Sequence, residues 1–216
     1  MNELTINKQA KLSDHLASPS TAALSHSSEL NGLRLSPHFT LGELTKTKHV
    51  TADGNIPSHA VIDNLLNLCW WLEELRYSYN TLYCLQPGED YETSKNVEGI
   101  VINSGYRSPA VNKLAGGAAT SNHVTGCAVD IRCAGKEQMI RYATILLDIA
   151  DSAKRDLTYS RVCSHSAEPM QASRCARSTA DFDELLFEQR GNVCWLHFAV
   201  RPPSQQNRRK VAFIKA

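Results

Sequence analysis

Two histidines and one aspartate are the side chains in this sequence best suited to bind a metal ion together. His123 and Asp130 lie in the segment 121–130, and His197 lies in a short apolar segment near the C-terminus. In one unbroken strand His123 and Asp130 would be about 23 Å apart, too far to share an ion. Gly126 removes this difficulty if the chain turns there, so that His123 approaches from a loop and Asp130 projects from the strand that follows.

Strand alternation predicts which side of each strand the ligands occupy. It places Asp130 on the face opposite Val129 and Ile131, and it places His197 on the same face as Trp195. Two imidazoles and one carboxylate, with a fourth position left to water, are the ligand set of a catalytic zinc site. We therefore predict that the two histidines and the aspartate bind Zn²⁺.

The elements that must position these residues are predicted from apolar periodicity and turn signals. Two helices show three-four spacing of apolar residues, and a hairpin is indicated by two apolar segments joined by Gln-Arg-Gly-Asn. A Thr followed three residues later by Glu indicates a further, short helix. The predicted elements are the short helix after Thr40, a helix at 58–79, a buried strand at 99–104, a helix at 136–153, and the hairpin of 184–188 with 194–200.

Length, composition and charge indicate the domain organisation of the chain. The chain has 216 residues, of which 42% are hydrophobic, enough for one globular domain with an extension. We expect a flexible leader at 1–35, the metal-bearing domain at 36–201, and a basic, solvated tail at 202–216. The formal net charge of +1 gives no global argument for a nucleic-acid partner or an anionic membrane surface.

The sequence also yields an expectation about location. No segment approaches the roughly 18 apolar residues that span a bilayer, and residues 1–20 contain no apolar run of signal-peptide length. We therefore expect synthesis in the cytoplasm without classical export. Separately, we expect the protein to be a monomer.

A longer motif carries a family resemblance. The pattern Ser-x-His-x-x-Gly-x-Ala-x-Asp at 121–130 is preceded by Ser-Gly-Tyr-Arg-Ser at 104–108 and followed by a Trp-x-His strand at 195–197. Together these resemble the family of zinc D-alanyl-D-alanine carboxypeptidases and peptidoglycan endopeptidases, which includes many phage endolysins. The resemblance runs from about residue 36 to residue 200.

The resemblance implies a fold, a cofactor and a reaction. The fold would be α+β, with a small antiparallel sheet that carries one zinc ion and is flanked by helices. The reaction would be hydrolysis of a peptide bond in peptidoglycan stem peptides, as a carboxypeptidase or an endopeptidase acting at the bacterial cell wall. In that family the matching side chains bind zinc, so this role falls on His123, Asp130 and His197.

Two further residues have roles implied by the family. Its members use the arginine of Ser-Gly-Tyr-Arg at the substrate end of the cleft, and a guanidinium is suited to hold a carboxylate or polarise a carbonyl oxygen. Arg107 is therefore expected both to bind substrate and to stabilise developing charge, the alternative being a surface arginine beside a proline turn. Ser121 is expected to hydrogen-bond the substrate or groups around the ligands.

The general base is where the sequence departs from the family. Many members carry Glu or Asp three residues before the final histidine, where this sequence has Cys194; others carry a histidine two residues before it, where this sequence has Trp195. A hairpin would bring Glu188 close to the last histidine, so Glu188 is the expected base. A charged strand end facing solvent is the alternative, and Asp183 and Glu184 are further candidates.

Other readings remain open. The missing family base keeps alive a non-catalytic, zinc-containing module that binds peptidoglycan without cutting it, which could be phage-associated, and a structural component of a phage particle is a third reading. The seven scattered cysteines indicate free, buried thiols rather than disulfides. Cys163, His165 and Cys175 offer only three of the four ligands that a second, structural zinc site requires.

Overall fold

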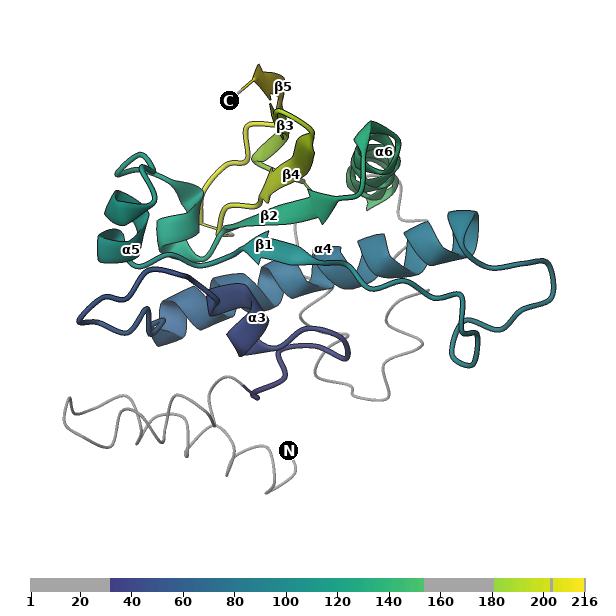
Figure 1. Cartoon of the computed structure of the whole chain (residues 1–216), viewed down its shortest axis with the longest axis horizontal. Helices are drawn as coiled ribbons and strands as arrows, with labels where there is room; N and C mark the ends of the chain where they lie inside the picture. Colours follow the sequence, from purple (N-terminus) through teal and green to yellow (C-terminus); the bar gives the residue numbers. More distant parts are fainter. Residues whose placement is uncertain (1–31, 154–180, 203, 216) are drawn as a thin grey trace.

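The computed structural model describes residues 32–153, 181–202 and 204–215, which form helices and one sheet (Figure 1). This is the predicted α+β class. The helices are α3 (Leu41–Thr45), α4 (His59–Tyr83), α5 (Pro109–Leu114), the 3-10 helix η1 (Asn122–Thr125) and α6 (Lys136–Ala153). The strands are β1 (Ile102–Ser104), β2 (Ala128–Cys133), β3 (Glu184–Arg190), β4 (Val193–Ala199) and β5 (Lys210–Lys215).

The sheet has the strand order β1-β2-β4-β3-β5. Its first four strands pair antiparallel, as predicted, and β3 with β4 forms the predicted hairpin. The fifth strand, β5, differs from the prediction because it lies within the expected solvated tail and pairs parallel to β3. The apolar run 211–214 supplies a strand, and the basic residues Arg208 and Lys210 before it stay exposed but also pair with acidic side chains.

One face of the sheet carries the hydrophobic core. Helices α4 and α6 lie along this face (Figure 1). Trp71 of α4 packs on Phe198 of β4 with ring centroids 5.2 Å apart. Val129 and Ile131 of β2 are fully buried there, as strand alternation predicts. The opposite face of the central strands is therefore free to carry polar side chains.

The last residues of the expected leader contact the domain. Arg34 forms an isolated bridge with Thr40, and Leu35 is buried in the core. Thr40 then caps α3 in a capping box with Glu43, the pattern expected from the sequence. The rest of the expected leader, residues 1–31, lies outside the described residues.

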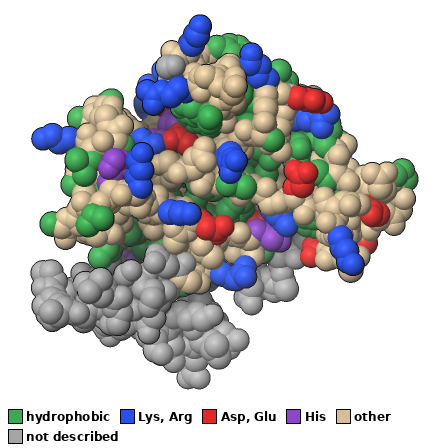
Figure 2. All heavy atoms as spheres, in the orientation of Figure 1, with side chains coloured by type: hydrophobic (Ala, Val, Ile, Leu, Met, Phe, Trp, Pro, Cys, Tyr) green, Lys and Arg blue, Asp and Glu red, His purple; other side chains and the backbone are tan. Residues whose placement is uncertain are grey.

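Two surface properties bear on function. In Figure 2, basic and acidic side chains are interspersed over the visible face rather than gathered into one charged patch. Within the described ranges, no helix combines the length and the apolar character that crossing a bilayer requires.

Candidate metal centre

A tight turn delivers His123 to the polar face of the sheet. His123 lies in η1, where its backbone N–H donates to the Ser121 hydroxyl at 3.3 Å. Gly126 ends this helix in the left-handed region with φ 70°, so the predicted turn at this glycine is present. An added Cβ at Gly126 would lie 2.8 Å from a methyl carbon of Val61 on α4. The turn therefore needs glycine for its backbone angle and for its close approach to the helix.

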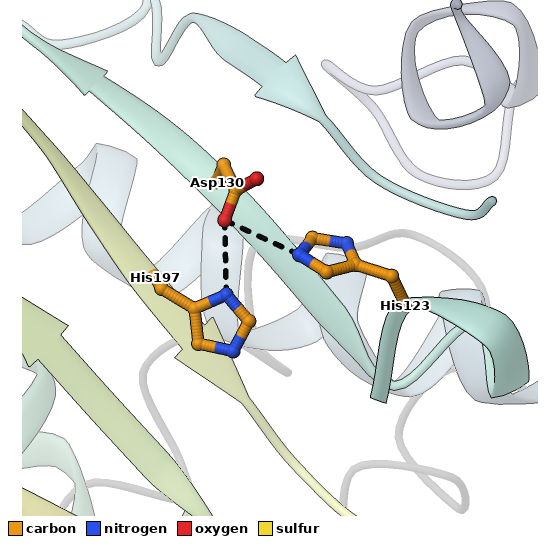
Figure 3. A group of neighbouring side chains, drawn as sticks. All are labelled: His123, Asp130 and His197. Carbon is orange, nitrogen blue, oxygen red and sulfur yellow. Dashed lines mark hydrogen bonds and ion pairs between the residues drawn. The ribbon is translucent and has the colours of Figure 1, made fainter. Parts of the chain in front are cut away.

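Strand pairing delivers the other two groups. Asp130 of β2 lies directly opposite His197 of β4 in the antiparallel register, so their side chains project from the same face. The Nδ1 atom of His197 lies 2.9 Å from Oδ1 of Asp130, and the Nε2 atom of His123 lies 3.2 Å from the same oxygen (Figure 3). The structure thus brings together three side chains from three different elements.

The His123 ring is oriented from its outer side. Its Nδ1 atom lies 2.7 Å from the backbone carbonyl oxygen of Gly105, which accepts a hydrogen bond when Nδ1 carries the proton. Nε2 is then left with a lone pair directed at the centre. Gly105 lies so close to α3 that an added Cβ would fall 2.3 Å from the Leu44 carbonyl oxygen. The Ser-Gly-Tyr-Arg segment therefore supports a metal ligand with its backbone.

Arg107 lies on the outer side of the same carboxylate. Its Nη2 atom donates to Oδ2 of Asp130 at 2.5 Å, and its Nε atom donates to the Ser104 hydroxyl at 2.7 Å. The guanidinium is mostly buried, with 18% of its side chain exposed, so it is not the surface arginine of the alternative reading. It contacts Oδ2 and leaves Oδ1 for the two histidines.

The pKa values of Asp130 and His197 are shifted by the contacts between them and their neighbours. Burial by itself would raise the pKa of Asp130, yet the charges and hydrogen bonds of His123 and His197 hold that pKa well below its usual range. For His197, burial disfavours the charged ring, but the contacts with Asp130 and Glu184 outweigh it and raise its pKa to about 9. The site therefore holds a fixed carboxylate that attracts positive charge.

The three donors fit zinc. Their ligand atoms all lie within 4.8 Å of one another, and all three residues are buried or half-buried. Tetrahedral zinc with bonds of about 2.0–2.1 Å separates its ligand atoms by about 3.4 Å, close to the separations of 2.9 and 3.2 Å that join Asp130 to the two rings. Imidazole and carboxylate are also the donors of catalytic zinc sites. The cluster can therefore hold a zinc ion with little rearrangement.

The two family positions for a base are placed differently by β4. Cys194 is buried and faces the core side of the sheet, opposite Cys133 of β2, because strand alternation turns it away from His197. Trp195 shares the face of His197 and lies opposite Glu188 of β3. A side chain at position 194 therefore cannot reach the centre from this strand.

Three acidic residues in β3 or directly before it are candidates for the general base. Asp183 is fully buried and ion-paired with Arg201 and Arg208, so it is neutralised away from the centre. Glu184 lies 3.7 Å from His197 but also contacts cationic side chains, and its pKa is lowered to about 2, with the contact to His197 as the largest cause.

Glu188 has the opposite electrostatics. It is half-buried on the same sheet face as His197, one diagonal step away in the register. Burial is the largest cause that raises its pKa, and the charge of Asp130 raises it further. Diagonal neighbours lie about 7–8 Å apart, a gap that a Glu side chain and one water can span. Of the three acids, Glu188 has the environment of a proton acceptor.

Sequence reasoning missed two features of this neighbourhood. It did not anticipate that Asn122, beside the first histidine, donates to both Asp183 and Glu184, although an amide next to a ligand was visible. It also did not anticipate that Arg208 and Lys210 contact Glu184. The candidate second zinc site at 163–175 lies outside the described residues.

The segment that holds the first two ligands is similar to a known protein family. Residues 90–151 match the family model Peptidase M15, which confirms the resemblance read from the motifs. The match contains Arg107, Ser121, His123 and Asp130 and ends before β3 and β4. M15 peptidases are zinc-dependent, in agreement with the donor set. A search of curated proteins finds no match to the chain.

Proposed function

Because residues 90–151 match the peptidase M15 family, we propose that this protein is a zinc peptidase that hydrolyses a peptide bond in peptidoglycan stem peptides. The observation that carries the proposal is the convergence of His123, Asp130 and His197, from η1, β2 and β4, on one point. The family match covers residues 90–151, and β4, which lies beyond it, places His197 opposite Asp130. We further propose that the protein acts at the bacterial cell wall as a monomer.

Within this proposal zinc, when bound, supplies Lewis acidity for the scissile carbonyl and for the attacking water. Glu188 accepts the proton that this water releases and passes it to the departing amine. The raised pKa of Glu188, caused by burial and by the nearby Asp130 charge, suits both halves of that task, because a base with a higher pKa takes a proton more readily and still returns it.

Arg107 and Ser121 have supporting roles in the proposal. The Arg107 guanidinium neutralises Oδ2 of Asp130 and adds positive charge beside the developing oxyanion. Ser121 caps η1 through the backbone N–H of His123. Its half-buried hydroxyl can accept a hydrogen bond from the substrate backbone as well.

The test is hydrolysis of purified peptidoglycan by the full chain, followed as newly formed amino groups. We expect Glu188→Gln to retain its zinc and to lose about 10²–10⁴ in turnover, because the amide cannot accept the proton. Glu137→Gln, which changes an exposed acid on α6, is the matched control and should match the wild type.

Two outcomes would contradict the proposal. Undiminished turnover in Glu188→Gln would remove this residue from the mechanism. Tight binding of zinc-loaded wild type to peptidoglycan without any new amino groups would identify the binding module instead. The buried Cys194 favours that module, because the family's usual base position then carries no acid.

A further inference from the structure

Glu184 contacts the outer nitrogen of a zinc ligand. Its Oε2 atom lies 3.7 Å from Nε2 of His197, on the side of the ring opposite the Nδ1 atom that faces Asp130. At this length the contact is electrostatic rather than a full hydrogen bond. A carboxylate on the outer nitrogen favours the tautomer with the proton on Nε2, which leaves the Nδ1 lone pair for a metal.

The C-terminal segment fixes the other oxygen of Glu184. Both Nη2 of Arg208 and Nζ of Lys210 lie 3.1 Å from Oε1. Lys210 begins β5 and lies opposite Glu184 in the parallel β3–β5 register, so the contact follows from strand pairing. With Oε1 occupied by two cations, only Oε2 is turned toward the histidine.

Asn122 ties the same carboxylate to the first half of the site. Its Nδ2 atom donates to Oε2 of Glu184 at 3.1 Å and to Oδ2 of the fully buried Asp183 at 2.9 Å. Asn122 immediately precedes His123 in η1. A single network therefore joins the outer sides of the two ligand-bearing segments.

We infer that Glu184 is a positioning residue that orients His197 for metal binding, and that β5 is part of the metal site because Arg208 and Lys210 hold Glu184 in place. The inference rests on zinc binding as proposed above. It assigns no chemical step to Glu184, since both of its carboxylate oxygens are held by Asn122, Arg208 and Lys210. It predicts that metal affinity depends on residues more than ten positions beyond the last ligand.

The experiment measures zinc affinity of the folded full chain by competition with a chromophoric chelator. We expect Glu184→Ala to weaken zinc binding about 10- to 100-fold, the range usual for loss of an outer partner. Glu184→Gln keeps the shape and the hydrogen bond from Asn122 but loses the charge, so we expect a loss near the lower end of that range. It also serves if the alanine variant fails to fold.

The second arm tests the C-terminal strand. Lys210→Gln should weaken zinc binding in the same direction by a few-fold, because the one described partner of its ammonium group is Glu184. Arg209→Gln is the matched control, since its guanidinium pairs with Asp151 and Asp181 instead, and it should leave affinity within about twofold. In the Glu184→Gln background, Lys210→Gln should cause no further loss.

A spectroscopic readout separates orientation from general destabilisation. In the zinc-loaded wild type, imidazole ¹H–¹⁵N spectra should show His197 with its proton on Nε2, protected from exchange, and Glu184→Gln should speed that exchange. Unchanged zinc affinity in folded Glu184→Gln, or an equal loss in Arg209→Gln and Lys210→Gln, would overturn the inference. A wild type that binds no zinc would overturn the proposed function as well, so the two failures are distinguishable.

Discussion

Gly126→Ala tests the turn that brings His123 and Asp130 together. The glycine has φ 70°, and an added Cβ would lie 2.8 Å from a side-chain carbon of Val61 and 2.9 Å from the Val61 carbonyl oxygen. The backbone angle costs an L residue about 1–2 kcal/mol, and overpacking against α4 costs about 1–3 kcal/mol more. After a small entropic gain in the unfolded chain, we expect the free energy of unfolding to fall by about 2–4 kcal/mol.

Gly191→Ala is the matched control for the steric part of that loss. Gly191 also has a positive φ, 57°, but an added Cβ there has no heavy atom within 4 Å. We expect this hairpin variant to lose about 1 kcal/mol, the cost of its backbone angle alone, and to keep the zinc affinity of the wild type. Urea denaturation of both variants measures the difference, and equal losses of unfolding free energy in the two would refute the close approach of the turn to α4.

Three further expectations concern pH and metal. The acid limb of the pH profile of kcat/KM should have an apparent pKa above the ordinary glutamate value of about 4.3, because burial raises the pKa of Glu188. This limb should be absent in Glu188→Gln. Burial raises the pKa of Glu74 to about 7, so the folded state favours its neutral form; this stabilisation is complete below about pH 4.5 and is lost as pH rises through 7. Glu74→Gln should therefore stabilise the protein by about 3 kcal/mol at pH 8 and by little at pH 4.5 in urea denaturation, and a pH-independent difference would contradict this. Chelation should abolish hydrolysis and zinc should restore it, whereas His123→Ala should not be restored.

Local patterns predicted the elements that depend on local physics. The apolar three-four spacing predicted α4 and α6, and the polar turn between two apolar segments predicted the β3–β4 hairpin. These elements form because each buries a continuous face or stripe against the core. Their ends shifted by a few residues, as for α4, which continues to Tyr83 instead of ending at 79.

The convergence of the ligands was predictable in outline. A glycine between His123 and Asp130 indicated a turn, and alternation placed Asp130 opposite the apolar face of its strand and His197 on the face of Trp195. The sequence could not set the register that makes these two residues direct neighbours in β2 and β4, because pairing between distant segments is decided by the whole sheet.

The C-terminal strand and its contacts were beyond reach for the same reason. Residues 211–214 form a short apolar run after a basic stretch, a pattern equally typical of a terminal tail. Only the parallel pairing with β3 brings Lys210 opposite Glu184. The carboxylate that looked like an alternative base is thereby surrounded by cations and becomes unsuited to accept a proton.

The most direct test of the central claim is X-ray absorption at the zinc edge of the folded, metal-loaded chain. If His123, Asp130 and His197 hold the ion, the first shell contains only nitrogen and oxygen at about 2.0–2.1 Å, with the outer-shell scattering of two imidazoles. A sulfur shell at about 2.3 Å would instead assign the zinc to cysteines, and would contradict a peptidase centre built on β2, β4 and η1.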